Sequence, residues 1–322
     1  MARPVRWGIL GTGTIAHAFS AALRGMDARI AAVGSRRQES ADSFGDAFAI
    51  GRRHASYEAL VADPEVDVVY VATPNALHKD HVILCLKAGR AVLCEKPLAI
   101  SADEGEAMVG CARERGLFLM EAMWTGFFPA IAKLEELLAA GAIGEPRLVT
   151  ADFGFREEEV DPEQPLFDKA LGGGALLDVG SYGLWLAALV LGEPTGLTSQ
   201  AHLGETGVDE QSAVVMSYPG GALAILHTAI RTETPQEAVI AGTRGWIRLD
   251  APWWRPARLR LKVHGADEQI FDLPYEGNGY AHEAREVMRC LHAHETESPR
   301  MPLAQSLSIL RTMDSLRAQW AD

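Results

Sequence analysis

The stretch Arg6-Trp7-Gly8-Ile9-Leu10-Gly11-Thr12-Gly13-Thr14-Ile15-Ala16 decides the fold of this chain. A short apolar run up to Leu10 stops at Gly11, and a helical pattern follows from Ile15 to Leu23. A strand, a glycine turn and a helix with the spacing G-x-G-x-x-A are typical of a dinucleotide-binding βαβ unit. A tight turn with no ligand would show the same glycines, but the position of this one, between a strand and a helix, favours the cofactor interpretation.

The glycines of this turn have separate physical roles. Gly11 would make the tight turn, and Gly13 would let backbone N–H groups approach a pyrophosphate with no side chain in the way. Ala16 would keep the helix close to the strand, and the helix N-terminus offers unpaired N–H groups to an anion. The residues expected to hold the cofactor phosphates are therefore Gly11, Thr12, Gly13, Thr14 and Ile15.

Composition excludes several classes of protein. A chain of 322 residues with 48% hydrophobic residues is long enough for two domains with sizeable cores. The net charge of −13 argues against binding of nucleic acid or anionic membranes. We expect no segment that is long and apolar enough to span a bilayer. We also expect no signal peptide, because the chain runs almost at once into its first strand. The four cysteines lack C-x-x-C spacing, so we expect reduced thiols in a cytoplasmic protein: Cys85, Cys94, Cys111 and Cys290.

The end of the second predicted strand, 29–33, bears on which dinucleotide binds. NAD-binding units usually place an acidic residue there to accept hydrogen bonds from the ribose hydroxyls. This chain has Ser35, Arg36 and Arg37, which could instead donate to a 2′-phosphate. The pattern favours NADP and leaves NAD possible; a solvated basic turn is the alternative.

Two further predicted strands, 66–71 and 91–94, deliver polar residues to the same edge of a parallel sheet. In open parallel sheets, ligands lie beyond the carboxyl ends of the strands. The first strand leads to Thr73, Pro74, Asn75 and His78, and the second to Glu95, Lys96 and Pro97. We expect Asn75 and His78 on the nicotinamide and ribose side, although a lone loop histidine is more often structural.

The second half of the chain has a different pattern. A helix at 102–115 and a strand at 117–120 close a first domain, 1–122, and leave a second domain, 123–322. Apolar runs and period-two alternation predict a mostly antiparallel sheet with helices on one face. The run 222–230 is apolar on both faces, so its other face is expected to pack on a partner sheet. The predicted helices are 129–140, 174–191, 281–292 and 303–319, and the predicted strands are 147–155, 197–203, 211–218, 222–230, 237–241, 245–249, 258–263 and 269–273.

With the glycine turn, the segments Glu95-Lys96-Pro97 and Gly172 to Tyr182 make the chain resemble the Gfo/Idh/MocA oxidoreductases. Within that family it is most similar to the dimeric dihydrodiol dehydrogenases, a group that includes NADP-dependent D-xylose 1-dehydrogenases. The similarity extends over nearly the whole chain, through the segments 116–129, 205–209 and 218–221. It implies a Rossmann domain, a second α/β domain whose open sheet forms a homodimer, and a cis peptide before Pro97. Gly126 departs from the group, in which a larger residue is expected after Trp-Thr.

The resemblance and the chemistry together assign catalytic roles to three residues. Oxidation of an alcohol by hydride transfer needs a general base within hydrogen-bond reach of the hydroxyl. Asp178 and Tyr182 are four apart on a predicted helix and would share one face. We expect Tyr182 to act as acid/base, Lys96 to favour its phenolate, and Asp178 to hold the lysine or a substrate hydroxyl. Half-buried packing is the structural alternative for Tyr182.

Aromatic residues could supply a wall for a ring-shaped substrate. Trp124, Phe127 and Phe153 are the candidates, although aromatic residues more often belong to a core. His292 and His294 lack acidic or cysteine partners, so no metal site is predicted. The pair Trp253-Trp254 receives no role.

The leading prediction is an NADP-dependent dehydrogenase of a cyclic polyol, either an aldose oxidised to a lactone or a trans-dihydrodiol oxidised to a catechol. The enzyme alternatives are a sugar-carbonyl reductase and an NAD-dependent inositol or sugar dehydrogenase. The alternative of a different class is a nucleotide-sensing protein without turnover. Retention of Lys96, Asp178 and Tyr182 argues against a sensor, which would need only the glycine turn.

Overall fold

The computed structural model describes residues 3–26 and 28–320 and divides into two compact units. The first unit comprises Met1–Trp124 and Glu276–Leu307, and the second comprises Thr125–Tyr275 and Ser308–Asp322. The sequence places everything after residue 122 in the second domain, whereas the segment Glu276–Leu307 clusters with the first unit. Periodicity along a chain cannot reveal such a return, because the return depends on which surface the helix covers.

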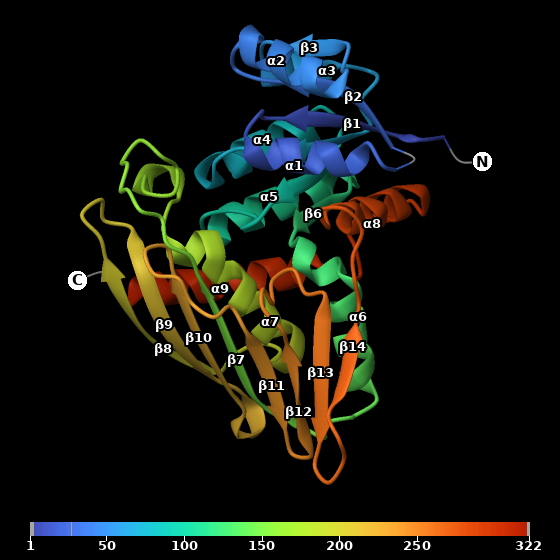
Figure 1. The fold of residues 1–322 in the computed structure, drawn as a ribbon. Coiled ribbons are helices and arrows are strands. Elements are labelled where there is room, and N and C mark those ends of the chain that lie inside the picture. The colour runs from blue at the N-terminus through green and yellow to red at the C-terminus, as the bar shows by residue number, and fades with distance from the viewer. Residues whose placement is uncertain (1–2, 27, 321–322) are drawn as a thin grey trace. The chain divides into compact units, whose positions relative to one another are not determined.

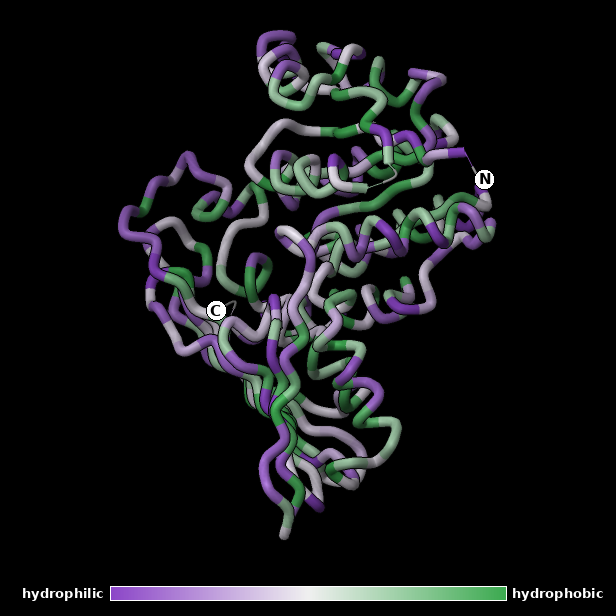
Figure 2. The backbone as a smooth tube through the Cα atoms, turned by 45° about the vertical axis from the view of Figure 1, so that its right-hand side comes forward, coloured by the Kyte–Doolittle hydropathy of each residue, from purple (hydrophilic) through white to green (hydrophobic). Residues whose placement is uncertain are grey.

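The first unit contains a six-stranded parallel sheet with the order β3-β2-β1-β4-β5-β6. Its central strands are buried on both faces, and Trp7, Ile9 and Tyr70 are fully shielded from solvent. Figure 2 shows the same strands as hydrophobic along much of their length. The strands are β1 (Val5–Leu10), β2 (Ala28–Gly34), β3 (Arg52–His54), β4 (Val68–Val71), β5 (Ala91–Glu95) and β6 (Leu119–Ala122).

Helices connect these strands, and local signals fix several of their ends. The Ser56 hydroxyl caps α3 by accepting from the Ala59 N–H at 3.1 Å, and the Ser101 hydroxyl caps α5 in the same way. Gly116, with φ +61°, ends α5. The helices of this unit are α1 (Thr14–Leu23), α2 (Gln38–Phe48), α3 (Tyr57–Ala62), η1 (Asn75–Leu77), α4 (His78–Lys87), α5 (Ala102–Arg115) and α8 (Ala281–His292).

The segment Glu276–Leu307, which contains α8, packs on the rest of the first unit through residues on either side of this helix. The Asn278 amide donates to the Ala18 carbonyl at 2.7 Å, and the Leu119 N–H donates to the Thr296 carbonyl at 3.1 Å. Tyr280 lies edge-on to Phe19, with ring centroids 6.4 Å apart. This segment therefore packs against α1 and β6 of the first unit.

The second unit contains an eight-stranded sheet with the order β14-β13-β12-β11-β7-β10-β9-β8. Only β7 and β10 pair in parallel, so the prediction of a mostly antiparallel sheet is confirmed. The strands are β7 (Pro146–Gly154), β8 (Gly196–Leu203), β9 (Asp209–Ser217), β10 (Leu223–Ala229), β11 (Ala238–Gly242), β12 (Gly245–Leu249), β13 (Arg258–Val263) and β14 (Gln269–Asp272).

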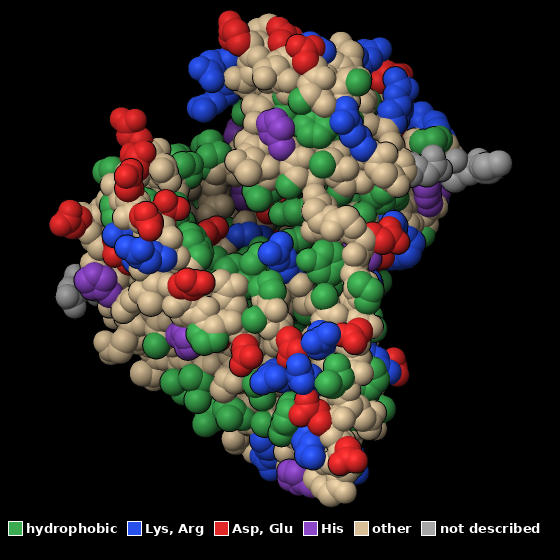
Figure 3. Space-filling model, viewed as in Figure 1, with side chains coloured by type: hydrophobic (Ala, Val, Ile, Leu, Met, Phe, Trp, Pro, Cys, Tyr) green, Lys and Arg blue, Asp and Glu red, His purple; other side chains and the backbone are tan. Residues whose placement is uncertain are grey.

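Helices cover one face of this sheet, with α7 against β7 and β10 (Figure 1). On the other face, Val215, Leu223 and Ile225 are 45%, 40% and 42% exposed. Figure 3 shows this face, on which Lys, Arg, Asp and Glu side chains gather toward β13 and β14. The helices are η2 (Trp124–Phe127), α6 (Pro129–Ala139), η3 (Lys169–Leu171), η4 (Leu176–Gly180), α7 (Ser181–Leu191), η5 (Pro219–Gly221) and α9 (Leu303–Ala318), of which η2 and α9 each cross from the first unit into the second.

One expectation about membranes is corrected. The helical run Lys169–Leu191 is long and apolar enough, by length and composition, to cross a bilayer. However, 72% of its most apolar window is buried inside the protein. Leu184, Trp185 and Leu186 are each 4% exposed or less, so the apolar character of this run is that of a core helix.

Candidate active site

The glycine turn has the geometry that a dinucleotide phosphate requires. Gly11 has φ +103°, and a Cβ there would lie 2.7 Å from the Ala72 carbonyl oxygen. A Cβ on Gly13 would meet nothing within 4 Å, and no side chain caps the N-terminus of α1 at this residue. Thr14 and Ile15 follow in the first turn, and Ile15 is 41% exposed. The backbone conformation requires a glycine at position 11, and Gly13 leaves room for an anion. The turn therefore fits the predicted cofactor.

The basic residues after β2 lie next to this turn. Ser35 is buried, whereas Arg36 and Arg37 are exposed. A hollow of about 510 Å³ is lined by both Thr12 of the glycine turn and Arg37, together with His17, Glu39, Ser40, Ser43 and Phe44. The Arg37 guanidinium donates to the Ser40 hydroxyl at 3.2 Å. The turn and an arginine therefore face one space of a size suited to the adenosine end of a dinucleotide.

Thr73, Pro74, Asn75 and His78 follow β4, but His78 does not face solvent. Its ring is fully buried, with Nε2 at 2.8 Å from the Thr73 carbonyl oxygen and Nδ1 at 2.9 Å from the Pro97 carbonyl oxygen. Burial lowers the pKa of His78 to about 4, so the neutral ring can donate to one of these carbonyls. This geometry favours a role in joining two loops of the site rather than the direct ligand contact that the sequence suggested.

The Glu95-Lys96-Pro97 segment ends β5 with the cis peptide that the resemblance implied. The Tyr70 hydroxyl donates to the Glu95 carboxylate, and the Lys96 N–H donates to the same carboxylate at 3.2 Å. Burial raises the pKa of Glu95 and of Glu121, while the positive charge of Lys96 opposes both rises. Lys96 therefore lies within electrostatic reach of two buried carboxyls at the cofactor edge of the sheet.

In the second unit, Asp178 and Tyr182 lie on one continuous helical segment with an irregular start. The run Leu176–Gly180, which carries Asp178, is a single π-helical turn, and α7 begins immediately after it at Ser181. The sequence predicts a regular helix over 174–191. Such π turns are often found at functional sites, because the extra residue per turn redirects side chains.

The start of this segment is held by Asp209 of β9. One Asp209 carboxylate oxygen accepts from the Leu176 N–H at 2.7 Å, and the contact is buried. Burial raises the pKa of Asp209 to about 7, and the hydrogen bond from Leu176 opposes that rise. Asp209 thus satisfies a backbone donor at the beginning of the turn that carries Asp178.

The Tyr182 ring lies beside two aromatic residues. The ring centroids of Tyr182 and Phe153 are 5.3 Å apart, and those of Tyr182 and Trp254 are 6.3 Å apart. Phe153 and Trp254 are stacked, with centroids 4.8 Å apart and planes 4° from parallel, and we call this pair the aromatic wall. Phe153 was predicted as part of such a wall, whereas Trp254 was not, because its only sequence signal is its place in a proline-flanked loop between two strands.

Hydrogen bonds hold the aromatic wall in place. The Trp254 indole N–H donates to the Gln236 side chain at 3.0 Å, and the Thr125 hydroxyl donates to the Trp254 carbonyl at 2.5 Å. The neighbouring Trp253 is fully buried and donates to the Asp152 carbonyl at 2.6 Å. Trp253 therefore anchors the loop, and Trp254 contributes its ring to the aromatic wall.

The other predicted substrate residues are placed differently. In the first unit, Trp124 stacks on Tyr280, with centroids 4.3 Å apart and planes 7° from parallel, and the sequence analysis missed Tyr280. Phe127 is 4% exposed, and its part in substrate binding stays a prediction. At Gly126, a Cβ would lie 2.9 Å from the Trp185 ring. The departure from the subfamily pattern therefore coincides with close packing against a tryptophan of α7.

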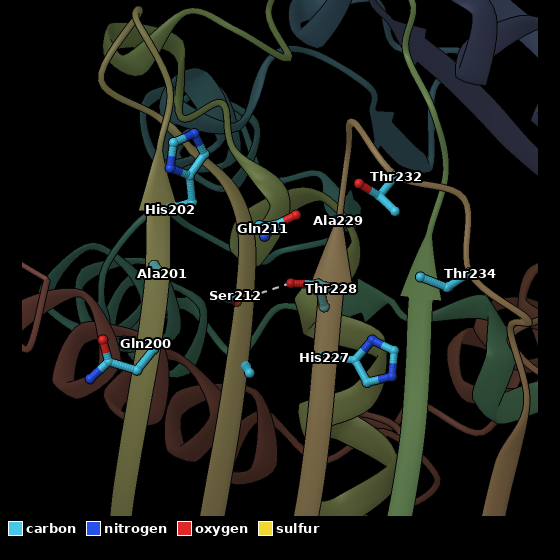
Figure 4. Close-up of a pocket in the computed structure, with 11 residues that line it drawn as sticks. Gln200, Ala201, His202, Gln211, Ser212, His227, Thr228, Ala229, Thr232 and Thr234 are labelled. Atoms are coloured by element: carbon cyan, nitrogen blue, oxygen red, sulfur yellow. Dashed lines mark hydrogen bonds between the residues drawn. The ribbon is translucent and has the colours of Figure 1, made fainter.

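A further hollow of the second unit holds none of the predicted site residues. It has a volume of about 420 Å³ and lies on the open sheet face at β8, β9 and β10, with Gln200, His202, Gln211 and His227 around it (Figure 4). The hydroxyls of Ser212 and Thr228 hydrogen-bond beneath it at 3.0 Å. Among residues 3–26 and 28–320, no group of three or more metal-ligating side chains is found.

The parallel sheet, the glycine turn at its carboxyl edge and the second α/β unit define a nicotinamide-dinucleotide-dependent oxidoreductase. Residues 5–123 match the oxidoreductase family with an NAD-binding Rossmann fold, and residues 131–248 match the Gfo/Idh/MocA C-terminal domain. The chain therefore belongs to the Gfo/Idh/MocA oxidoreductase family, which confirms the predicted family and fold class.

Similar proteins extend over the full length of the chain. The trans-1,2-dihydrobenzene-1,2-diol dehydrogenase of Danio rerio is 39% identical, covering 98% of this chain and 96% of its own. The human protein of the same name is 36% identical, covering 97% of this chain and 96% of its own. Among solved structures, an aldose-aldose oxidoreductase of Caulobacter crescentus has a TM-score of 0.89 at 26% identity, covering 98% of this chain and 97% of its own. A 3-ketoreductase of Actinomadura kijaniata, in complex with NADP and TDP-benzene, has a TM-score of 0.87 at 28% identity, covering 98% of each chain.

Proposed function

We propose that this protein is an NADP-dependent dehydrogenase that oxidises a secondary hydroxyl on a ring, with a trans-dihydrodiol or an aldose as substrate. The observation that carries the proposal is the aromatic wall of Phe153 and Trp254 beside the Tyr182 ring. Flat aromatic faces bind the apolar face of a pyranose or a cyclohexadiene, and a nearby hydroxyl can exchange a proton with the substrate. The names of the full-length relatives support the same substrate class.

The first unit supplies the features that would hold the nucleotide. The open space at Gly13 and the uncapped start of α1 accommodate a pyrophosphate, and Ser35, Arg36 and Arg37 can donate to a 2′-phosphate. Bound nicotinamide would accept the hydride that leaves the carbinol carbon. Loss of that hydride makes the hydroxyl proton acidic, and Tyr182 takes the proton as general base.

Lys96 and Asp178 have supporting roles in this proposal. The ammonium of Lys96 favours the phenolate of Tyr182, because a nearby positive charge stabilises a negative one. Asp178 holds either that lysine or a neighbouring substrate hydroxyl. In the reductive direction, Tyr182 returns the proton to a sugar carbonyl, so reduction of a sugar ketone is the second candidate reaction, favoured by the likeness to the ketoreductase.

The test is the absorbance of reduced nicotinamide after the purified protein is mixed with NADP⁺ or NAD⁺ and a panel of aldoses, inositols and trans-dihydrodiols. We expect signal with NADP⁺ and a pentose or a dihydrodiol. Signal with NAD⁺ alone would overturn the assignment of Ser35, Arg36 and Arg37. Tight cofactor binding without turnover in either direction would favour a nucleotide-sensing protein.

We also propose that the protein is a cytoplasmic homodimer joined through the open face of the second sheet. On that face Ile225 is paired in register with Val215, and Leu223 lies two residues along the same strand. All three side chains are at least 40% exposed, and a contiguous apolar sheet face of this kind is usually covered by a partner. The four cysteines form no disulfide, as in reducing compartments.

A further inference from the structure

Glu283, on α8 of the first unit, is a fully buried carboxyl with no assigned role. Its exposed fraction is 0%, and neither of its carboxyl oxygens has a hydrogen-bond partner among residues 3–26 and 28–320. An ionised carboxylate in such a place would be very costly, because nothing replaces the water that it loses. The side chain is therefore neutral and presents an O–H donor that needs an acceptor.

The charged group that acts on Glu283 is Glu95, at the carboxyl end of β5. Burial, and then the charge of Glu95, raises the pKa of Glu283 well above its usual range. Glu95 itself accepts hydrogen bonds from the Tyr70 hydroxyl and, at its other oxygen, from the Lys96 N–H. Hydrogen bonds accepted at both oxygens are the pattern of an ionised carboxylate. Burial raises the pKa of Glu95, and the hydrogen bond from Tyr70 and the positive charge of Lys96 oppose that rise.

Tyr70 and Tyr280 complete the surroundings of this pair. Burial, and then the charge of Glu95, raises the pKa of the Tyr70 hydroxyl well above its usual range, so Tyr70 remains a donor at neutral pH. The Phe19 ring stacks on Tyr70 at 3.9 Å and meets Tyr280 edge-on. Phe19 thus links Tyr70, which is bonded to Glu95, with Tyr280, which lies one helical turn before Glu283.

We propose that Glu283 is a positioning residue whose carboxyl is protonated in the resting enzyme and donates a hydrogen bond to Glu95 through one buried water. That hydrogen bond stabilises the ionised form of Glu95, whose negative charge then helps to orient the adjacent Lys96. The consequence for turnover rests on the proposed function, in which Lys96 tunes the acid/base. The protonation state of Glu283 is independent of the proposed function and is tested separately.

The first test is infrared spectroscopy of the full-length protein in D₂O at neutral pH, without substrate. We expect E283Q to lose one C=O stretching band of an unionised carboxyl relative to the wild type. Loss of a carboxylate band instead would overturn the proposal. Because no turnover is needed, this result stands even if every substrate in the panel fails.

The second test compares pH profiles of kcat/KM for E283Q and E283L, measured with NADP⁺ and the best substrate of the panel. Glutamine keeps a neutral donor, so E283Q should stay within about threefold of the wild type and keep its profile. Leucine removes the donor, so kcat should fall about tenfold. The acidic limb of the pH profile of kcat/KM should move up by about one pH unit, because Glu95 is then protonated more easily.

Glu286 provides the matched control, because it lies on the same helix and is also buried. Its carboxylate is bound by Arg289 at 2.9 Å and by Ser298 at 2.6 Å. E286L should lower stability and leave the acid limb in place. If E283L and E286L give the same pH profile, Glu283 has only a structural role and the proposal is wrong.

Discussion

Phe153 and Trp254 stack with their ring planes 4° from parallel, although 101 positions separate them in the chain (254 − 153). The stack lies beside Tyr182, so a ring bound against Trp254 would lie near the Tyr182 side chain, which carries a hydroxyl. Aromatic stacking contributes about 0.5–1.5 kcal/mol beyond the area it buries. The pair is therefore the part of the second unit best suited to select a cyclic substrate.

Replacing Trp254 by leucine should raise KM for a ring substrate about tenfold, since a stacking face and its buried area are both lost. Steady-state kinetics with the best substrate of the panel measures this effect. Trp320, whose indole donates to the Ser199 hydroxyl at 2.8 Å, is the control, and W320L should leave KM unchanged. An unchanged KM in W254L would remove the aromatic wall from the substrate site.

Replacing Tyr182 by phenylalanine should keep NADP binding and lower kcat by about 10²- to 10⁴-fold, the usual contribution of a general acid/base. Binding is measured by fluorescence titration and kcat by nicotinamide absorbance. Tyr218, buried in the same unit with its hydroxyl directed to the Met216 sulfur at 3.8 Å, is the control, because Y218F removes a hydroxyl outside the proposed chemistry. Turnover like that of the wild type in Y182F would rule out its role.

Removing both Arg36 and Arg37 should weaken binding of NADP⁺ about tenfold or more and leave binding of NAD⁺ nearly unchanged, because only NADP⁺ carries the 2′-phosphate. Isothermal titration with both nucleotides checks this. Arg24, exposed at the end of α1 and bonded to the Ala47 carbonyl at 2.9 Å, is the control arginine. Equal losses for the two nucleotides would place these arginines outside the 2′-phosphate site.

Asp209 should make stability depend on pH. Its folded-state pKa of about 7 lies above the ordinary value of 3.8, so the folded protein holds this proton more tightly than the unfolded chain. The contribution is full below about pH 4 and is lost as pH rises to about 7, a change of up to about 4 kcal/mol. Denaturant unfolding of D209N against wild type should show a difference that varies across this window; a constant difference would contradict the assignment.

Replacing Ile225 by lysine should convert the proposed dimer to a monomer, because it places a charge in the middle of the apolar patch. Sedimentation velocity measures the mass. Lys262, on the same sheet at β13 and bonded to the Ala266 carbonyl at 2.7 Å, offers a control position at which K262A should not change the mass. A monomeric wild-type protein at micromolar concentration would overturn the proposed dimer.

Much of the fold could be predicted because it follows from local rules. Several predicted segments agree with the structure at both ends, among them α5, β12, β13 and α8. In each, apolar periodicity and flanking turn residues act over a few positions. The three-residue strand β3 was not predicted, since Arg52–His54 has no apolar pattern and pairs only because β2 offers a free edge.

The candidate site divides in the same way. The glycine turn, Lys96, Asp178 and Tyr182 could be proposed from the sequence because motifs mark them, and their roles stay predictions. Tyr280 and Trp254 were not predicted, because each ring gains its stacking partner, Trp124 and Phe153 respectively, only in the folded protein. Conversely, His78 looked like a ligand contact until the structure showed both ring nitrogens turned to backbone carbonyls.

The sequence by itself determined the class of fold, the family and the edge of the sheet predicted to bind a nucleotide. Glycine spacing and hydrophobic periodicity involve residues close together in the chain, so they can be read without the structure. Tertiary structure alone decided that α8 returns to the first unit, that a π turn carries Asp178, and that the Glu283 carboxyl is fully buried without a hydrogen-bond partner among residues 3–26 and 28–320. These features depend on burial and on contacts between distant segments. Such interactions exist only when the chain has packed, because packing is what removes water from a carboxyl and brings two rings face to face.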